Sequence, residues 1–181
     1  MVIVKIVGGL GNQMFCYAYA KALEKKGYKV KIDISAYKTY ALHGGYQLDK
    51  YNINLKVSSI KENNNFYRNT IINKTLQKLK LYKGRIIKEK SLLFSNDLLD
   101  IDDGNYIDGF FQSEQYFLAV KEKILKEFTI KDNLSDYAKL MGQKIQSADN
   151  TVSIHIRRGD YIFNKSARKI HGICSLSYYQ Q

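Results

Sequence analysis

The 181-residue sequence predicts an α/β fold, with a Rossmann-like parallel sheet and flanking helices. Three observations support this prediction. Residues 2–34 follow the order strand, glycine loop, helix, strand, which is a βαβ unit with a parallel pair. Residues 113–147 carry two apolar patterns at helical spacing, and residues 151–156 alternate apolar and polar side chains as a strand does.

The first βαβ unit is predicted from its residue types. Residues 2–7 form a β-branched run that ends in glycine, which favours a buried strand. Asn12 is expected to cap a helix over 12–26, and Gly27 is expected to end it. Residues 28–34 are β-rich and alternate, so they are expected to form the second strand.

The remaining elements are less regular. Residues 36–70 are expected to hold loops and short helices, and residues 92–99 a short strand or a helix. The run 68–90 has eight basic residues and one acidic residue. Its residues Ile72, Leu76 and Leu79 permit an amphipathic helix, either solvated or attached to an anionic membrane surface.

The second half of the chain is predicted to continue the α/β pattern. We expect a strand over 106–111, a helix over 113–128 capped by Ser113, a helix over 133–147 and a strand over 151–156. A further helix is expected to open near Tyr178.

A domain junction is expected at Asp149-Asn150. This divides the chain into a first domain, 1–148, and the beginning of a second, 149–181. The second part is too short for a doubly wound domain, which needs on the order of 100 residues.

Composition bounds the class of protein. The chain is 45% hydrophobic and 25% charged, as is ordinary for a globular protein. Its two cysteines, Cys16 and Cys174, are too few for a disulfide framework, and no signal peptide is recognised, so a cytoplasmic protein is expected. The net charge of +12 favours anionic partners: phosphate-bearing substrates, acidic lipid or nucleic acid.

The segment TVSIHIRRGDY, residues 151–161, carries the clearest chemistry. An apolar strand runs directly into Arg157 and Arg158, and ligands of open α/β sheets bind at carboxyl strand ends. The arginine fork matches two phosphate oxygens, so this pair can neutralise a leaving diphosphate. Gly159 permits close backbone approach, and Asp160 can orient an arginine or a sugar hydroxyl. Ordinary surface charge at a strand end is the alternative.

The loop GGLGNQ, residues 8–13, allows two interpretations. Gly9 and Gly11 after a first strand, with Asp33 about 20 residues further on, are similar to a dinucleotide-binding fingerprint and permit an NAD(P)-dependent oxidoreductase. The third glycine position holds methionine, however. Asn12 and Gln13 carry amides that suit the hydroxyl array of a sugar acceptor. A plain strand-to-helix turn is the structural alternative.

Two shorter segments contain residue types that occur in binding sites. In residues 109–114, GFFQSE, the aromatics are expected in the core rather than as a sugar platform. His171 and Cys174 lack the partners of a zinc site or a nucleophile–base pair, so a loop that shapes a pocket is expected there.

Four segments in this order, GGLGNQMF, GFFQSEQYF, VSIHIRRGDY and HGICSLSYY, resemble the bacterial α-1,2-fucosyltransferases. The resemblance extends from Gly8 to Tyr179. It implies facing Rossmann-like halves of the glycosyltransferase B type, and inverting transfer of L-fucose from GDP-fucose to a galactose hydroxyl of a glycan. It implies neither a metal nor a cofactor. Segments resembling FSDD and NSTFSWW, which help to hold the donor in the family, are absent from this sequence, so the second domain is expected to be incomplete.

The resemblance also assigns site residues. Arg157 and Arg158 match the contacts to the donor diphosphate, and Arg158 is the stronger candidate. His155, Asp160 and Tyr161 match the other fixed positions of the motif, with Asp160 and His155 as candidates for the general base.

On the other half, the family's cleft is lined by residues that match Gly9, Gly11, Asn12 and Gln13. The expected partners are a nucleotide sugar, a galactose-containing acceptor and, by peripheral contact, the inner face of an anionic membrane. An oxidoreductase, a nucleic-acid-binding module and an inactive fragment that binds only acceptor remain as alternatives.

Overall fold

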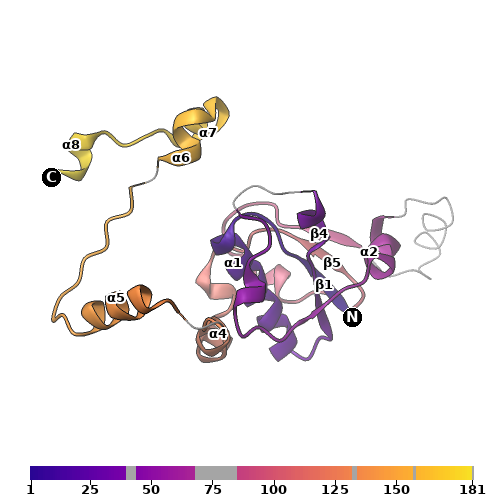
Figure 1. Ribbon diagram of the computed structural model, residues 1–181. Coiled ribbons are helices and arrows are strands. Elements are labelled where there is room, and N and C mark those ends of the chain that lie inside the picture. The colour runs from indigo at the N-terminus through magenta and orange to yellow at the C-terminus, as the bar shows by residue number, and fades with distance from the viewer. Residues whose placement is uncertain (40–43, 68–84, 132–133, 157, 181) are drawn as a thin grey trace, which may run out of the picture. The chain divides into compact units, whose positions relative to one another are not determined.

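The computed structural model describes residues 1–39, 44–67, 85–131, 134–156 and 158–180 (Figure 1). The chain divides into two compact units, 1–133 and 134–181. The predicted domain junction at residue 149 stays a prediction.

The first unit is built on a five-stranded parallel sheet. Its strands are β1 (Val2–Lys5), β2 (Val30–Asp33), β3 (Lys56–Val57), β4 (Ile86–Lys88) and β5 (Tyr106–Asp108). Their spatial order is β3-β2-β1-β5-β4, and every neighbouring pair is parallel. The predicted α/β class and the parallel pairing of the first two strands are therefore confirmed.

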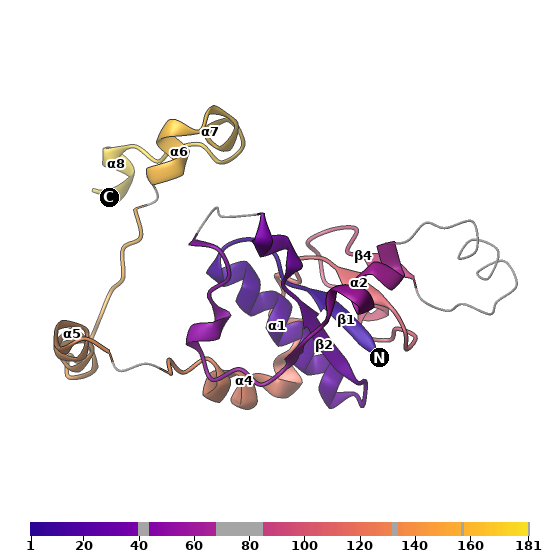
Figure 2. The same cartoon turned by 45° about the vertical axis from the view of Figure 1, so that its right-hand side comes forward.

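Side chains on successive strand residues point to opposite faces of the sheet, and a helix packs against each face. One face packs against helix α1 (Leu10–Lys25), which lies along β1 and β2 in Figure 2. The side chains buried in this layer are Val2, Val4, Cys16, Tyr19, Leu23, Val30, Ile32 and Ile107. Helix α2 (Ile60–Tyr67) belongs to the other face, where the Phe66 and Tyr106 ring centroids are 5.6 Å apart.

Helix α1 begins earlier than predicted. Its N-cap is Gly9, so Asn12 lies within the first turn and is not the cap. The prediction of Asn12 as the N-cap was wrong because Gly9 already has the extended backbone that an N-cap needs. The predicted end at Gly27 is confirmed: Gly27 has φ +96°, and the N–H groups of Gly27 and Tyr28 donate to the carbonyls of Glu24 and Leu23.

Short helical turns make up much of the chain outside the strands and the helices α1 and α2. The 3-10 turns are η1 (Ser35–Lys38), η3 (Leu48–Lys50), η4 (Asn96–Leu98), η5 (Glu114–Tyr116) and η6 (Leu118–Val120), and η6 is followed by helix α4 (Lys121–Glu127). The single helix predicted over 113–128 is thus broken. Tyr116 buries its ring against Phe94 and Phe111, and this tertiary packing overrides helical propensity.

Strand β4 lies near the end of the basic run 68–90, for which the sequence permitted an amphipathic helix. The residues that carried the amphipathic pattern, Ile72, Leu76 and Leu79, lie outside the described residues. Residues 92–99 form neither a strand nor a long helix, only bends and the turn η4.

The second unit contains helices α5 (Asp136–Gln146), α6 (Gly159–Phe163), α7 (Lys165–His171) and α8 (Leu176–Tyr179). Helix α5 confirms the predicted helix over 133–147, and its N-cap is Ser135, whose Oγ accepts from the Ala138 N–H at 3.2 Å. Helix α8 confirms the helix expected near Tyr178.

The strand predicted over 151–156 was wrong. These residues belong to no strand, and the apolar side chain of Val152 is 88% exposed. A strand needs hydrogen bonds from a neighbour, and within the described part of the chain this segment pairs with none.

Candidate functional site

The sheet reverses its strand order at β1, because β2 lies on one side of β1 and β5 on the other. Ligands of open α/β sheets bind in the crevice at such a point, outside the carboxyl ends of the strands. Two loops follow those ends here. One is the glycine loop, residues 6–9, and the other is the GFF turn, residues 109–112. Lys5 and Asp108, from β1 and β5, form an ion pair of 3.0 Å at this edge.

The glycine loop is closely fitted. Gly8 has φ +76°, which favours glycine, and a Cβ there would lie 2.6 Å from Nδ2 of Asn12. The Gly8 carbonyl accepts from the Tyr37 hydroxyl at 2.7 Å and from Nε2 of Gln13 at 3.0 Å. The chain therefore turns from β1 into α1 without room for a side chain, and the amino terminus of α1 faces the crevice edge.

The two amides predicted as site residues differ in their surroundings. Gln13 is buried; its Nε2 also donates to the Gly45 carbonyl at 2.8 Å, and its Oε1 accepts from the Gln47 N–H at 2.9 Å. Both amide hydrogens of Gln13 are thus engaged by backbone, which ties the glycine loop to residues 44–47. Asn12 is only partly buried, and its Oδ1 accepts from Nε2 of Gln112 at 2.7 Å.

The GFF turn is held by Glu89, a residue that the sequence analysis missed. Oε2 of Glu89 accepts from the N–H groups of Phe110 and Phe111, at 2.7 and 3.1 Å. Phe111 has φ +52°, a conformation that non-glycine residues rarely adopt and that the surroundings must hold. A Cβ on Gly109 would meet Glu89 Cβ at 2.6 Å, so only glycine fits beside this carboxylate.

The two aromatic residues of the GFF turn differ in their burial. Phe111 is buried and stacks on Tyr19 at 3.8 Å with an interplanar angle of 7°, which confirms the predicted core role for this ring. Phe110 is 40% exposed. The only sequence feature near Glu89 is the β-branched pair Ile86 and Ile87, which is too short to predict a strand among the surrounding lysines.

Cys16 lies beneath the same edge, and its Sγ contacts the Gly109 carbonyl at 3.3 Å. Burial raises the pKa of the Cys16 thiol to about 12. Cys174 in the second unit is exposed.

We therefore expect iodoacetamide to modify Cys174 in the native protein while Cys16 reacts only after unfolding. The thiolate is the reactive form, and burial suppresses both its formation and its access. Mass spectrometry of native and urea-unfolded protein measures this. The Cys174→Ser variant should show no native modification, and rapid native labelling of Cys16 would contradict the expectation.

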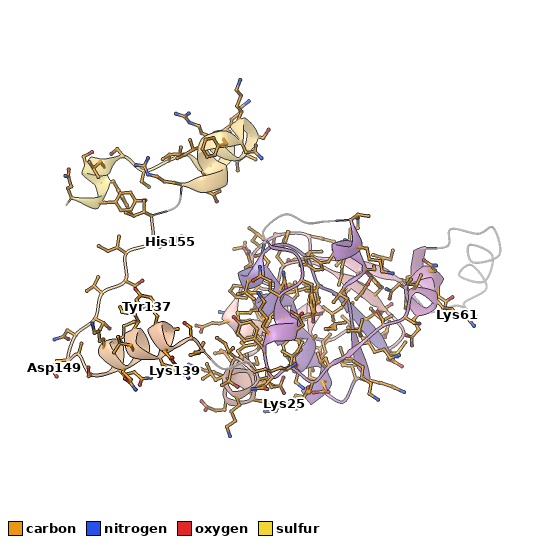
Figure 3. The ribbon with its side chains drawn as sticks, in the orientation of Figure 1. Lys25, Lys61, Tyr137, Lys139, Asp149 and His155 are labelled. Atoms are coloured by element: carbon orange, nitrogen blue, oxygen red, sulfur yellow. The ribbon has the colours of Figure 1, made fainter. Side chains whose placement is uncertain are left out.

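The predicted donor residues lie in the second unit. Figure 3 shows His155 on the extended segment that precedes α6, and its side chain is exposed. Arg158 is also exposed, and its carbonyl accepts from the Tyr161 N–H at 2.8 Å at the start of α6. Asp160 lies in the first turn of α6, and Arg157 lies outside the described residues. The donor roles of these residues stay predictions.

Asp33, the residue on which the dinucleotide alternative depends, is already engaged. It is 2% exposed; its Oδ1 accepts from the Ser35 N–H at 2.7 Å and its Oδ2 from the Tyr106 hydroxyl at 2.6 Å. A ribose would have to displace these bonds, so the geometry disfavours an NAD(P) site here.

The described residues contain neither a membrane-spanning helix nor a cluster of metal ligands. No helix among them is both long and apolar enough to cross a bilayer. In the same ranges, no three His, Cys, Asp or Glu side chains gather as metal ligands would. Metal independence and peripheral membrane contact stay predictions.

Comparison with known proteins places the chain in a family. A family model described as "Glycosyl transferase family 11" matches residues 1–181. An alpha-1,2-colitosyltransferase of Escherichia coli is 42% identical over 186 aligned positions, covering 99% of this chain and 61% of that relative. The O-antigen biosynthesis glycosyltransferase WbnK of Escherichia coli is 28% identical over 193 positions, covering 96% and 64%.

The chain thus spans about three fifths of the length of these relatives, at 61% and 64%. No solved structure matches it significantly. Because the family model matches the entire sequence, the chain belongs to glycosyl transferase family 11.

Proposed function

We propose that the protein transfers L-fucose from GDP-fucose to the 2-hydroxyl of a galactose residue, with inversion and without a metal, in the synthesis of a surface glycan. The observation that carries this proposal is the order of the four segments that resemble the α-1,2-fucosyltransferases. The 42% identity, over 99% of the chain, to an alpha-1,2-colitosyltransferase supports the α-1,2 linkage.

In this proposal the reaction is a single displacement at the anomeric carbon of the donor sugar. The acceptor hydroxyl attacks, the bond to the diphosphate oxygen breaks, and GDP leaves as an anion. Arg157 and Arg158 stabilise that anion through bidentate hydrogen bonds, the role a metal plays elsewhere. Asp160 and His155 are the candidates for the base that takes the hydroxyl proton.

The glycine loop serves the acceptor side. Gly9 and Gly11 leave the backbone at the start of α1 uncovered, and Asn12 presents a partly exposed amide there. Gln13 positions the loop through its three backbone hydrogen bonds.

Colitosyl transfer is the second candidate, favoured by the name of the 42% identical relative. Incubating the protein with a β-galactoside and either GDP-fucose or GDP-colitose, with and without EDTA, separates the candidates. We expect a disaccharide from GDP-fucose, of α-1,2 linkage by NMR, and no loss with EDTA. Product from GDP-colitose alone would assign the donor to the second candidate. Sugar binding without transfer from either donor would indicate a fragment that binds only acceptor.

A further inference from the structure

Strands β4 and β5 lie side by side in the sheet (Figure 1). A pocket of about 380 Å³ opens where these two strands end. Its lining residues come from these two strands and the turns that follow them: Lys88, Glu89, Lys90, Ser91, Leu92, Asp108, Gly109 and Phe110. The volume lies within the range of about 300–1,000 Å³ usual for small-molecule sites, and the pocket adjoins the carboxyl edge where such sites form.

The lining has the mixture of groups that a sugar needs. The ring of Phe110 is 40% exposed and offers an apolar face. Asp108 offers a carboxylate that is one quarter exposed and fixed by its ion pair of 3.0 Å with Lys5, and Ser91 adds a hydroxyl. An apolar face beside carboxylate and hydroxyl acceptors matches a pyranose ring, which has C–H groups on one face and hydroxyls at its rim.

Glu89 fixes the position of this aromatic ring. Its Oε2 accepts hydrogen bonds from the N–H groups of Phe110 and Phe111, which fixes the backbone of Phe110. The Phe111 ring is fixed in the core by stacking on Tyr19. Its Oε1 is buried and, among the described residues, makes no hydrogen bond. A buried carboxylate oxygen without a partner is costly, and the strained φ of +52° at Phe111 adds to that cost. Costs of this kind concentrate where geometry serves a function.

We propose that this pocket is the subsite for the acceptor galactose, with the apolar face of the sugar on Phe110 and its hydroxyls on Asp108 and Ser91. Glu89 is a positioning residue that holds Phe110 in place. The inference rests on the proposed function for the identity of the sugar, while the pocket itself rests on the residues described above.

The test is a saturation-transfer NMR titration of the full chain with methyl β-galactoside, without donor. We expect Phe110→Ala to weaken binding about tenfold or more, because the stacking face is lost. Phe110→Tyr keeps that face and should restore binding. Leu118→Ala is the matched control: Leu118 is an exposed apolar residue, at 53%, outside this pocket, and its loss should change nothing.

A second pair of variants separates positioning from contact. Glu89→Gln keeps an acceptor for the two N–H groups and should retain binding, whereas Glu89→Ala should weaken it. Asp108→Asn should weaken binding directly. Melting curves for each variant identify any that fail to fold. If Phe110→Ala fails to fold, the loss of binding expected in Asp108→Asn decides the proposal.

The outcomes distinguish the pocket from the reaction. Galactoside binding that depends on Phe110 and Asp108, without transfer from any nucleotide sugar, would support the subsite and remove the proposed function. Transfer whose KM for galactoside is unchanged, within about twofold, in Phe110→Ala and Asp108→Asn would overturn the subsite alone. Neither binding nor transfer would overturn both.

Discussion

Replacing Arg158 with alanine is expected to lower kcat/KM for transfer by about a thousandfold. In the proposed reaction the leaving diphosphate carries its developing charge without a metal, so the arginine supplies stabilisation that is larger in the transition state than in the ground state. The fall should therefore appear mainly in kcat. Steady-state kinetics with a labelled donor and a galactoside acceptor measures the effect.

Two further variants sharpen this prediction. Arg158→Lys keeps the charge but loses the fork, so it should restore activity only in part. Arg168→Ala removes another exposed arginine of the same unit, on helix α7, and should leave kcat/KM within about threefold of the parent. Parent-like activity in Arg158→Ala would remove the assignment of this residue to the diphosphate.

The sequence predicted the parts of the fold that depend on local patterns. The first βαβ unit was predicted from the β-branched runs of its strands, and the end of α1 from Gly27, whose φ of +96° favours glycine. The strand at 106–108 was also predicted. The apolar spacing of residues 113–128 identified the correct buried face, including Val120 and Ile124, although not the breaks between the turns.

The parts that failed depend on partners distant in sequence. Strand β4 is stabilised by pairing with β5, and three strand residues amid lysines carry no periodic signal of their own. At 151–156 the error was the opposite, because a strand was predicted where none forms. Apolar and polar residues alternate clearly there, but the segment has no pairing strand among the described residues. Glu89 was missed for the same reason as β4. Its role is to accept hydrogen bonds from the N–H groups of Phe110 and Phe111, which are about twenty residues away in the sequence.

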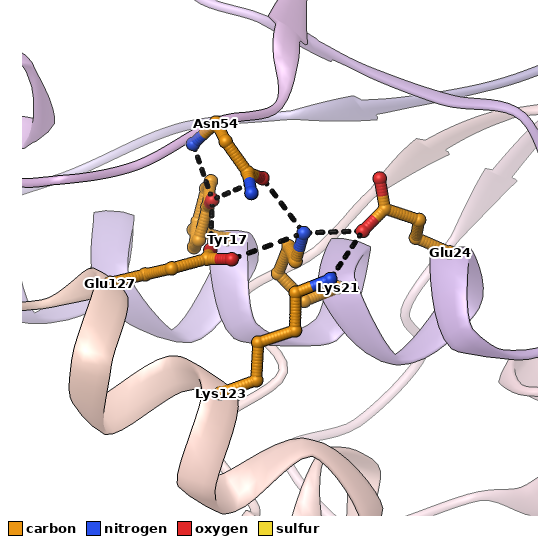
Figure 4. A network of polar contacts seen from close by, with 6 residues as sticks. All are labelled: Tyr17, Lys21, Glu24, Asn54, Lys123 and Glu127. Atoms are coloured by element: carbon orange, nitrogen blue, oxygen red, sulfur yellow. Dashed lines mark hydrogen bonds and ion pairs between the residues drawn. The ribbon is translucent and has the colours of Figure 1, made fainter.

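A buried ion network between α1 and α4 is equally invisible in the sequence, and it gives the largest expected effect on stability. The Lys21 side chain is fully buried, and its Nζ lies 3.3 Å from Oε1 of Glu127 and donates to Oδ1 of Asn54 at 2.8 Å (Figure 4). Nζ also pairs with Glu24, and the Tyr17 hydroxyl donates to Glu127. Burial and then the hydrogen bond to Glu127 raise the pKa of Tyr17, so this hydroxyl stays a donor.

We expect Lys21→Met to lower the free energy of unfolding by about 3 kcal/mol or more, because it leaves the buried carboxylate of Glu127 without its cation. Lys123→Met is the matched control: Lys123 reaches the same network, through Glu24 at 3.4 Å, but its side chain is 53% exposed. Its loss should cost less than about 1 kcal/mol. Urea denaturation monitored by circular dichroism measures both values.

The double variant Lys21→Met/Glu127→Leu decides whether the charge or the packing is responsible. Glu127 is only 7% exposed and the Lys21 side chain is fully buried, so replacing them with leucine and methionine removes two buried charges together. If uncompensated charge dominates, the double variant should be more stable than Lys21→Met, and the double-mutant cycle should give a coupling energy of about 1–3 kcal/mol. Strict additivity of the two single losses would instead mean that Lys21 stabilises the α1–α4 contact through its hydrocarbon stem and Asn54, with Glu127 held independently by Tyr17.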